Sequence, residues 1–217
     1  MKHLFLSVVA LTLCISCQTK EEVTLPSLVS GISQKVVTKD HIQFRDLNNN
    51  NTLDPYEDSS QPIDVRVSDL LRQMTLEEKA GMMFINGAPV STDGLADGNQ
   101  GLEGPAARMK SAVFNMDSLK MTHFNIWDIP ADPKIFATWY NNVQREAEAD
   151  RLGIPVTIAS DPRHHLGKNV IGMASTGFSQ FCEMPGFAAL GDESLVKEFA
   201  NIVREEYLAI GIREALH

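Results

Sequence analysis

The stretch "GIPVTIASDPRHHLG" at residues 153–167 decides the fold class, because it joins a short apolar run to a group of polar side chains. The run "IPVTIA" at 154–159 is almost continuously apolar, which is the pattern of a parallel strand covered on both faces. Asp161 would then stand at the carboxyl end of a buried strand, where parallel α/β sheets and barrels bind their ligands. The stretch therefore predicts a parallel α/β protein with Asp161 on its ligand side.

The segments around this strand alternate between strand and helix, as a parallel α/β fold requires. Capping residues and apolar spacing predict helices over 62–73, 75–81, 132–153 and 192–211, and short apolar runs predict strands over 41–46, 82–86, 123–127 and 212–217. Residues 88–118 and 161–191 are expected to be mostly loop, and loops as long as the second are generally functional. The strand at 212–217 has no helix after it, so the predicted sheet is unfinished.

The histidines of the opening stretch raise the question of a metal site or a catalytic pair. His164 and His165 are adjacent and would point in different directions, and no further ligand follows at a useful short spacing. Asp161 has no acidic neighbour before Glu183, so a pair of carboxylates is not visible either. Asp161 could simply cap its own loop through backbone hydrogen bonds, but its place after a buried strand favours contact with a ligand. Its carboxylate can accept hydrogen bonds from two neighbouring hydroxyls, which suits a sugar.

The amino terminus has the pattern of an export signal. Residues 1–16 contain a basic start at Lys2 and an apolar run too short to span a bilayer, and they are followed by Cys17. This arrangement resembles a bacterial lipoprotein signal, in which Cys17 becomes the lipidated first residue; the alternative is a plain signal peptide with an incidental cysteine. Residues 17–40 are then expected to be a polar tether, and the protein to lie in the cell envelope, lipid-anchored, or to be secreted.

Composition excludes one broad class of function. The 217-residue chain has a formal charge of -9 and no cluster of Lys and Arg, whereas proteins that bind nucleic acids normally present a basic face. Apolar residues make up 43% of the chain, which is ordinary for a soluble globular protein. We therefore expect no nucleic-acid partner.

The segment "DLNNNNTLDPYE" at 46–57, within a lead-in at residues 41–60, has the spacing of an EF-hand calcium loop. Oxygen donors fall at loop positions one, three, five, seven, nine and twelve: Asp46, Asn48, Asn50, Thr52, Asp54 and Glu57. The sixth position is Asn51 where glycine is usual, and it needs a positive φ, which asparagine tolerates better than most residues. The expectation is a structural Ca²⁺ site; the alternative is an Asn-rich turn that binds nothing tightly.

Three segments together resemble the amino-terminal part of glycoside hydrolase family 3, in its bacterial β-glucosidase-like branch. They are "RVSDLLRQMTLEEKAGMMF" at 66–84, "GIPVTIASDPRHH" at 153–165 and "ESLVKEFANIVREEYLAIGIREALH" at 193–217, in the family's order and spacing. The resemblance implies that residues 61–217 form the first part of a (β/α)8 TIM-type barrel, which is incomplete in this chain. It also implies hydrolysis of β-linked glucosides or oligosaccharides with retention, by two carboxylates about 5–5.5 Å apart.

The resemblance carries over only Asp161, as a ligand of hydroxyls on the terminal non-reducing sugar. Arg163 and His164 belong to the same motif and are expected to shape the loop. The family's nucleophile and acid/base residues match no residue up to His217, so neither Glu183 nor Glu214 takes either role and the chain alone is expected to be inactive. Catalysis requires no cofactor in this scheme.

A second hypothesis stays open beside the hydrolase. The calcium-type loop, the lipid anchor and the missing catalytic acids are also compatible with a calcium-stabilised, surface-anchored module that binds glycans or partners without catalysis. If the chain is a partial barrel, its uncovered strands and helix faces should make it poorly soluble or partly disordered alone.

Overall fold

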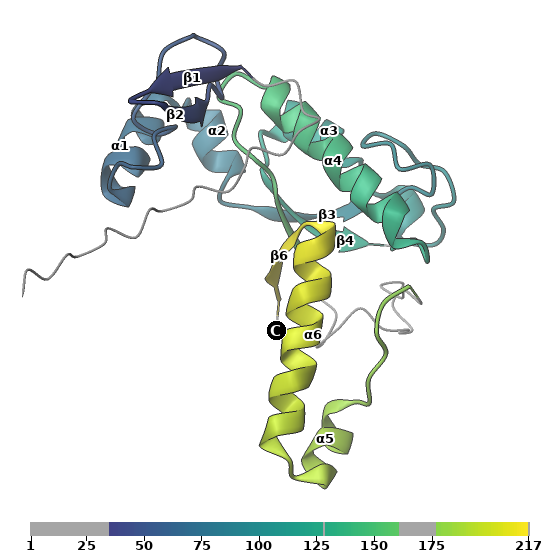
Figure 1. Cartoon of the computed structure of the whole chain (residues 1–217). Coiled ribbons are helices and arrows are strands. Elements are labelled where there is room, and N and C mark those ends of the chain that lie inside the picture. The colour runs from purple at the N-terminus through teal and green to yellow at the C-terminus, as the bar shows by residue number, and fades with distance from the viewer. Residues whose placement is uncertain (1–34, 128, 161–176, 217) are drawn as a thin grey trace, which may run out of the picture. The chain divides into compact units, whose positions relative to one another are not determined.

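A parallel sheet of four strands forms the centre of the structure, a computed structural model that describes residues 35–127, 129–160 and 177–216 (Figure 1). The strands are β3 (Ile85–Pro89), β4 (His123–Trp127), β5 (Thr157–Ser160) and β6 (Ile212–Ala215), and they pair in sequence order. Each consecutive pair is parallel, which confirms the predicted parallel α/β architecture.

Helices connect these strands, and their ends follow local sequence signals. They are α3 (Ala112–Leu119), α4 (Pro133–Ala149) and α6 (Glu193–Ile210). Asp132 and Asp192 cap the amino ends of α4 and α6 by accepting backbone N–H bonds, as expected. Gly211 ends α6 with a φ of 99°, a backbone geometry that favours glycine.

The hydrophobic core lies between one face of the sheet and these three helices. Phe124 and Ile126 of β4 and Ile158 of β5 are fully buried in it, together with side chains from all three helices. On β4 they alternate with residues that are only half-buried, His123, Asn125 and Trp127. Because side chains of a strand alternate between its faces, these three residues project from the opposite face of the sheet.

A β-hairpin precedes the sheet in the chain. It consists of β1 (Val36–Lys39) and β2 (Ile42–Arg45), joined by Asp40 and His41 with φ values of 51° and 67°. The sequence predicts a strand over 41–46, and β2 lies within that range, but β1 falls inside the predicted tether of residues 17–40. The tether prediction is therefore wrong for residues 36–39, where the β-branched residues of "VVTK" pair with β2 along the whole strand.

Two helices follow the hairpin, α1 (Ile63–Gln73) and α2 (Leu76–Gly81). In α2 the predicted capping box is complete: the Thr75 side chain accepts from the Glu78 N–H, and the Glu78 carboxylate accepts from the Thr75 N–H. Further along the chain, a short 3-10 helix covers Ala106–Arg108, and α5 (Met184–Leu190) occupies part of the expected long loop.

Two strands begin later than their apolar runs predicted. The expected strand over 82–86 is shifted to Ile85–Pro89, because Met82, Met83 and Phe84 extend the helical turn by donating to carbonyls three or four residues back. β5 begins at Thr157 rather than at residue 154, because Pro155 has no N–H to donate to a ladder.

The sheet is open at both sides in the part of the chain described here. β3 and β6 each pair with one neighbour only, and apolar side chains such as those of Met83 and Phe84 beside β3 are exposed. The described residues therefore form an open parallel sheet, and the incomplete barrel stays a prediction.

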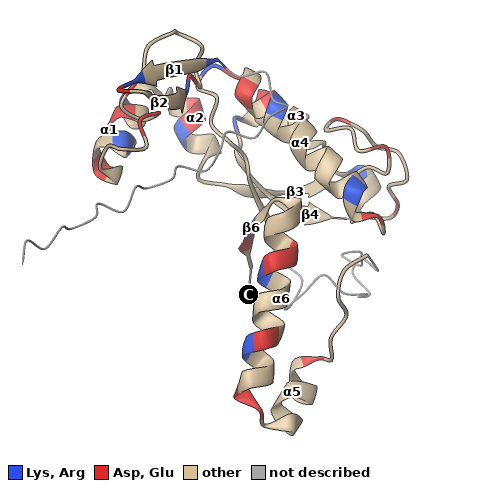
Figure 2. Ribbon diagram, in the orientation of Figure 1, with Lys and Arg blue, Asp and Glu red and all other residues tan. Residues whose placement is uncertain are grey.

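Charged residues are distributed without a basic cluster on the helices. Basic and acidic residues alternate along α6 (Figure 2). The side chains of its neighbouring residues Arg204 and Glu205 lie 3.3 Å apart. Within the described ranges, no helix has the length and apolar character needed to cross a membrane.

Candidate functional site

The candidate site is the carboxyl edge of the sheet, where β4 and β5 end side by side. Asn125 of β4 pairs in register with Ala159 of β5, and Ser160 is the last residue of that strand. Asp161, the predicted sugar ligand, follows directly in sequence but lies outside the described residues, as do Arg163 and His164. The described strands thus bring the chain to the expected edge without showing the side chain of Asp161.

The hydroxyl of Ser160, at the carboxyl end of β5, lies near the buried hydroxyl of Tyr207. Ser160 is fully buried, and neither its hydroxyl nor that of Tyr207 on α6 makes a hydrogen bond of normal geometry with the described residues. Burial raises the pKa of Tyr207 to about 12, although the nearby Ser160 hydroxyl lowers it somewhat. The Tyr207 hydroxyl is therefore neutral and keeps its proton at physiological pH.

The structure describes the positions of both glutamates to which the sequence assigns no catalytic role. Glu183 precedes α5 as its amino-terminal cap residue but makes no capping bond with its side chain. Glu214 lies in β6, in register with Ala159, and is exposed.

The backbone of the predicted calcium loop has the expected EF-hand features. Asn51, at the sixth position, has a φ of 61°, and Asn49 has a φ of 58°. The Asp46 carboxylate accepts the N–H groups of Asn50 and Asn51, at 3.0 and 2.9 Å. The prediction that asparagine takes the left-handed geometry at the sixth position is confirmed.

The side chains of the loop satisfy one another. Asp54 Oδ2 accepts the side-chain amides of Asn48 and Asn50 at 2.6 and 2.8 Å, and Glu57 accepts three backbone N–H groups. Among the described residues, no three acidic, His or Cys side chains converge as metal ligands. Burial raises the pKa of Glu57, and its bonds with backbone N–H groups only partly oppose this.

These observations bear on the calcium prediction in two ways. The donor types and the backbone fit an EF-hand loop, and the buried carboxylates would be stabilised by a cation. The two amides at Asp54, however, present N–H groups where calcium needs oxygen, so Asn48 and Asn50 would have to rotate their side chains. The calcium site stays a prediction, as does the role of Thr52.

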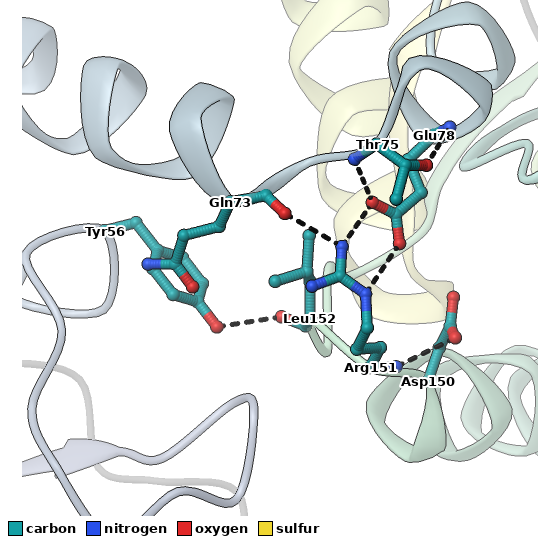
Figure 3. A network of polar contacts seen from close by, with 7 residues as sticks. All are labelled: Tyr56, Gln73, Thr75, Glu78, Asp150, Arg151 and Leu152. Atoms are coloured by element: carbon teal, nitrogen blue, oxygen red, sulfur yellow. Dashed lines mark hydrogen bonds and ion pairs between the residues drawn. The ribbon is translucent and has the colours of Figure 1, made fainter.

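A network of polar contacts fastens this lead-in and α2 to the turn before β5 (Figure 3). The Arg151 guanidinium donates to both oxygens of Glu78, at 2.5 and 3.2 Å, and to the backbone carbonyl of Gln73 at 3.0 Å. The Tyr56 hydroxyl donates to the carbonyl of Leu152 at 3.1 Å. All these contacts end at residues 151–152, at the amino-terminal side of β5, so they stabilise the strand from the end opposite the candidate site.

The ionisation of Glu78 reflects this network. Its burial would raise the pKa of its carboxyl, but the bonds from Arg151 and from the Thr75 N–H outweigh that effect and lower the pKa. The Glu78–Arg151 pair is therefore charged at neutral pH, with the acid largely buried and the base half exposed.

Comparison with curated proteins finds relatives that are much longer than this chain. The chain is 40% identical over 200 residues to probable β-glucosidase C of Aspergillus oryzae, which is 90% of this chain and 30% of that protein. It is 42% identical over 166 residues to β-glucosidase C of Emericella nidulans, covering 75% of this chain and 25% of the relative. A periplasmic β-glucosidase/β-xylosidase of Dickeya chrysanthemi is 40% identical over 199 residues, or 87% of this chain and 29% of that protein. No protein-family model matches the chain.

One similar solved structure is that of a glycoside hydrolase family 3 β-N-acetylglucosaminidase from Paenibacillus sp. str. FPU-7. The TM-score is 0.50 at 18% identity, over 66% of this chain and 24% of that one, so the likeness concerns the fold. The predicted resemblance to glycoside hydrolase family 3 is confirmed, because the chain is 40% or more identical to β-glucosidases over most of its length. The chain spans less than a third of the length of the curated relatives that it matches.

Proposed function

We propose that this chain is the amino-terminal, sugar-binding part of a β-glucosidase that releases glucose from the non-reducing end of β-glucosides or oligosaccharides. The observation that supports this most is the identity of 40% or more, over most of the chain, to proteins named as β-glucosidases from fungi and from a bacterium. The second activity in the name of the Dickeya chrysanthemi protein makes β-xylosides a further substrate class to test.

In this proposal Asp161 accepts hydrogen bonds from hydroxyls of the terminal sugar. Its support is the position after β5, at the carboxyl edge of a parallel sheet. A retaining glycosidase needs a nucleophile and an acid/base carboxylate, and we assign neither role to a residue of these 217. We therefore expect the 217-residue chain alone to be inactive.

We also propose that the protein works outside the cytoplasm, exported by residues 1–16 and anchored to a membrane through lipid on Cys17. These residues lie outside the described ranges, so the support comes from the sequence and from a relative that is named periplasmic. Metabolic labelling with a fatty-acid analogue, compared between wild type and Cys17→Ser, tests the anchor directly.

The experiment that tests the activity uses the complete gene product. Purified protein is assayed against aryl β-glucosides, β-xylosides and β-N-acetylglucosaminides, beside Asp161→Asn and beside the 217-residue chain. We expect β-glucoside hydrolysis by the complete protein, a large loss of kcat/KM in the Asp161 variant, and no activity of the 217-residue chain. We assign catalysis to residues other than these 217. If the 217-residue chain hydrolyses one of these glycosides, and Asp161→Asn abolishes that hydrolysis, this assignment is refuted.

The alternative is a calcium-stabilised, surface-anchored module that binds glycans without hydrolysing them. The positive φ of Asn51 in an EF-hand-type loop favours it. A complete gene product that binds β-glucans in a calcium-dependent way but hydrolyses none of the three aryl glycosides would support this alternative.

A further inference from the structure

Trp127 has a distinct position at the candidate site. It ends β4, on the face of the sheet opposite the helix-packed core, beside the carboxyl end of β5. The chain contains two tryptophans, and the other, Trp139 of α4, is fully buried in the core with its ring tilted against Phe136. Trp127 is only half-buried. The two tryptophans therefore differ in location: one belongs to the core, and the other lies at the ligand edge.

The space that the Trp127 ring occupies depends on a glycine in the neighbouring strand. Gly87 of β3 pairs in register with Asn125, two residues before Trp127. A Cβ atom at residue 87 would lie 3.0 Å from Cδ1 and Nε1 of Trp127, and 1.8 Å from the methyl group of Met109. The pyrrole edge of the indole and the Met109 methyl therefore pack directly on the backbone of Gly87. The absence of a side chain at residue 87 allows the ring to take this position.

The polar end of the indole is free. Its N–H makes no hydrogen bond with any described residue, and it is not among the polar atoms sealed from solvent. Tryptophan combines a large apolar face with one N–H donor, a combination that suits a partner with both apolar and hydroxyl groups. A β-linked glucopyranose has that character, because its equatorial hydroxyls leave axial C–H groups on both faces of the ring.

We propose that Trp127 is a substrate-contacting residue of this enzyme, whose indole stacks on a pyranose ring of the β-glucoside and donates its N–H to a sugar hydroxyl. This inference rests on the proposed function, and adds to it a second sugar contact on the strand next to the one that leads to Asp161. It assigns Trp127 to substrate binding, with no part in bond cleavage. Its loss should therefore raise KM and leave kcat nearly unchanged.

The first test is kinetic and uses the complete gene product. We compare Trp127→Ala, Trp127→Phe and a control, Phe114→Ala, which removes an aromatic ring that is 43% exposed on α3. Trp127→Ala should raise KM for aryl β-glucosides roughly tenfold, Trp127→Phe by a factor of about three or less, and the control not at all. An unchanged KM in Trp127→Ala overturns the proposal, as does an equal loss in the Ala and Phe variants.

The second test does not depend on catalysis. N-bromosuccinimide oxidises accessible tryptophans, so it should modify Trp127 well before Trp139 in the complete protein, with mass spectrometry locating the product. Cellobiose should slow this reaction severalfold, and mannitol at the same concentration should not. A Trp127 that is inaccessible without sugar, or equally reactive with and without cellobiose, overturns the proposal.

The two tests separate failure of this inference from failure of the proposed function. A complete protein that hydrolyses no β-glucoside contradicts the function, and cellobiose protection of Trp127 then still supports a sugar-binding site at this residue. Normal hydrolysis with a wild-type KM in Trp127→Ala leaves the function standing and removes the stacking role. Gly87→Ala, which displaces the ring without deleting it, should raise KM in the same direction as Trp127→Ala.

Discussion

Replacing Arg151 by alanine tests the network that fixes the turn before β5. The variant removes two charge-assisted hydrogen bonds to Glu78 and one to the carbonyl of Gln73. Breaking a fully buried pair costs about 3–5 kcal/mol, whereas an exposed pair is worth about 0–1 kcal/mol. Here the Glu78 side chain is 12% exposed and that of Arg151 is 49% exposed, and Glu78 keeps its bond from Thr75. We therefore expect a loss of about 2 kcal/mol in the free energy of unfolding.

The assay is thermal unfolding followed by circular dichroism at pH 7. A loss of about 2 kcal/mol corresponds to a Tm lower by about 4–8 °C for a chain of this size. The matched control is Arg145→Ala, on α4, whose exposed guanidinium bonds only Asn142 among the described residues. We expect its effect to stay within about 0.5 kcal/mol. Equal Tm values for the two variants would refute the reasoning.

The same comparison has a pH dependence of definite sign. The folded protein lowers the pKa of Glu78, so the folded state binds its proton less readily than the unfolded state. The stabilisation is therefore complete above the unfolded pKa of about 4.3, and it is lost as the pH falls through the lower, folded value. The Tm difference between wild type and Arg151→Ala should shrink in acid. A difference that does not change with pH would assign the effect to packing of the arginine stem.

Three further predictions concern the loop, a turn and the core. If calcium binds the lead-in loop, a concentration of 100 times its Kd should stabilise the chain by about 2.7 kcal/mol, and Glu57→Gln should abolish the rise in Tm; a chain indifferent to calcium would contradict the site. Gly153→Ala should destabilise more than Gly104→Ala, because both glycines have a φ of 55° but only at residue 153 would a Cβ lie 2.2 Å from the Leu47 carbonyl oxygen. Equal losses in urea unfolding would show that the clash is relieved at no cost. Ile158→Ala, at a fully buried position, should cost about 2–5 kcal/mol by the same measurement, and a loss under 1 kcal/mol would contradict its place in the core.

Features set by neighbouring residues were predictable from the sequence. The capping box of Thr75 and Glu78 and the stop at Gly211 depend on side chains within a few residues, and the structure has both. The order of strands and helices followed from the same signals, and parallel pairing followed from that order. Asn51 belongs here too, because the need for a positive φ comes from its position within the loop.

Features that depend on contacts between distant residues were not predictable. The proline and glycine of the segment "MPGFAAL" predict a loop, yet the segment forms α5, where Phe187 packs on Phe199 at 4.8 Å between ring centroids. Trp127 could be placed on a strand but not on a face, because its orientation became clear only from the register with β3 and from Gly87. No local signal in the sequence links these residues.

The anchors of the lead-in have a consequence for biosynthesis. Arg45 bonds Glu148, and Tyr56 bonds the Leu152 carbonyl, across 103 and 96 residues of sequence. At about 5–20 residues per second, a ribosome makes that intervening chain in roughly 5–20 s. During this interval the hairpin and its loop already exist, but the residues that will bind them have not yet been synthesised. Only contacts within the hairpin and loop can order this segment at that stage. The asparagine and aspartate side chains that close the loop on itself are therefore available seconds before its docking surface exists.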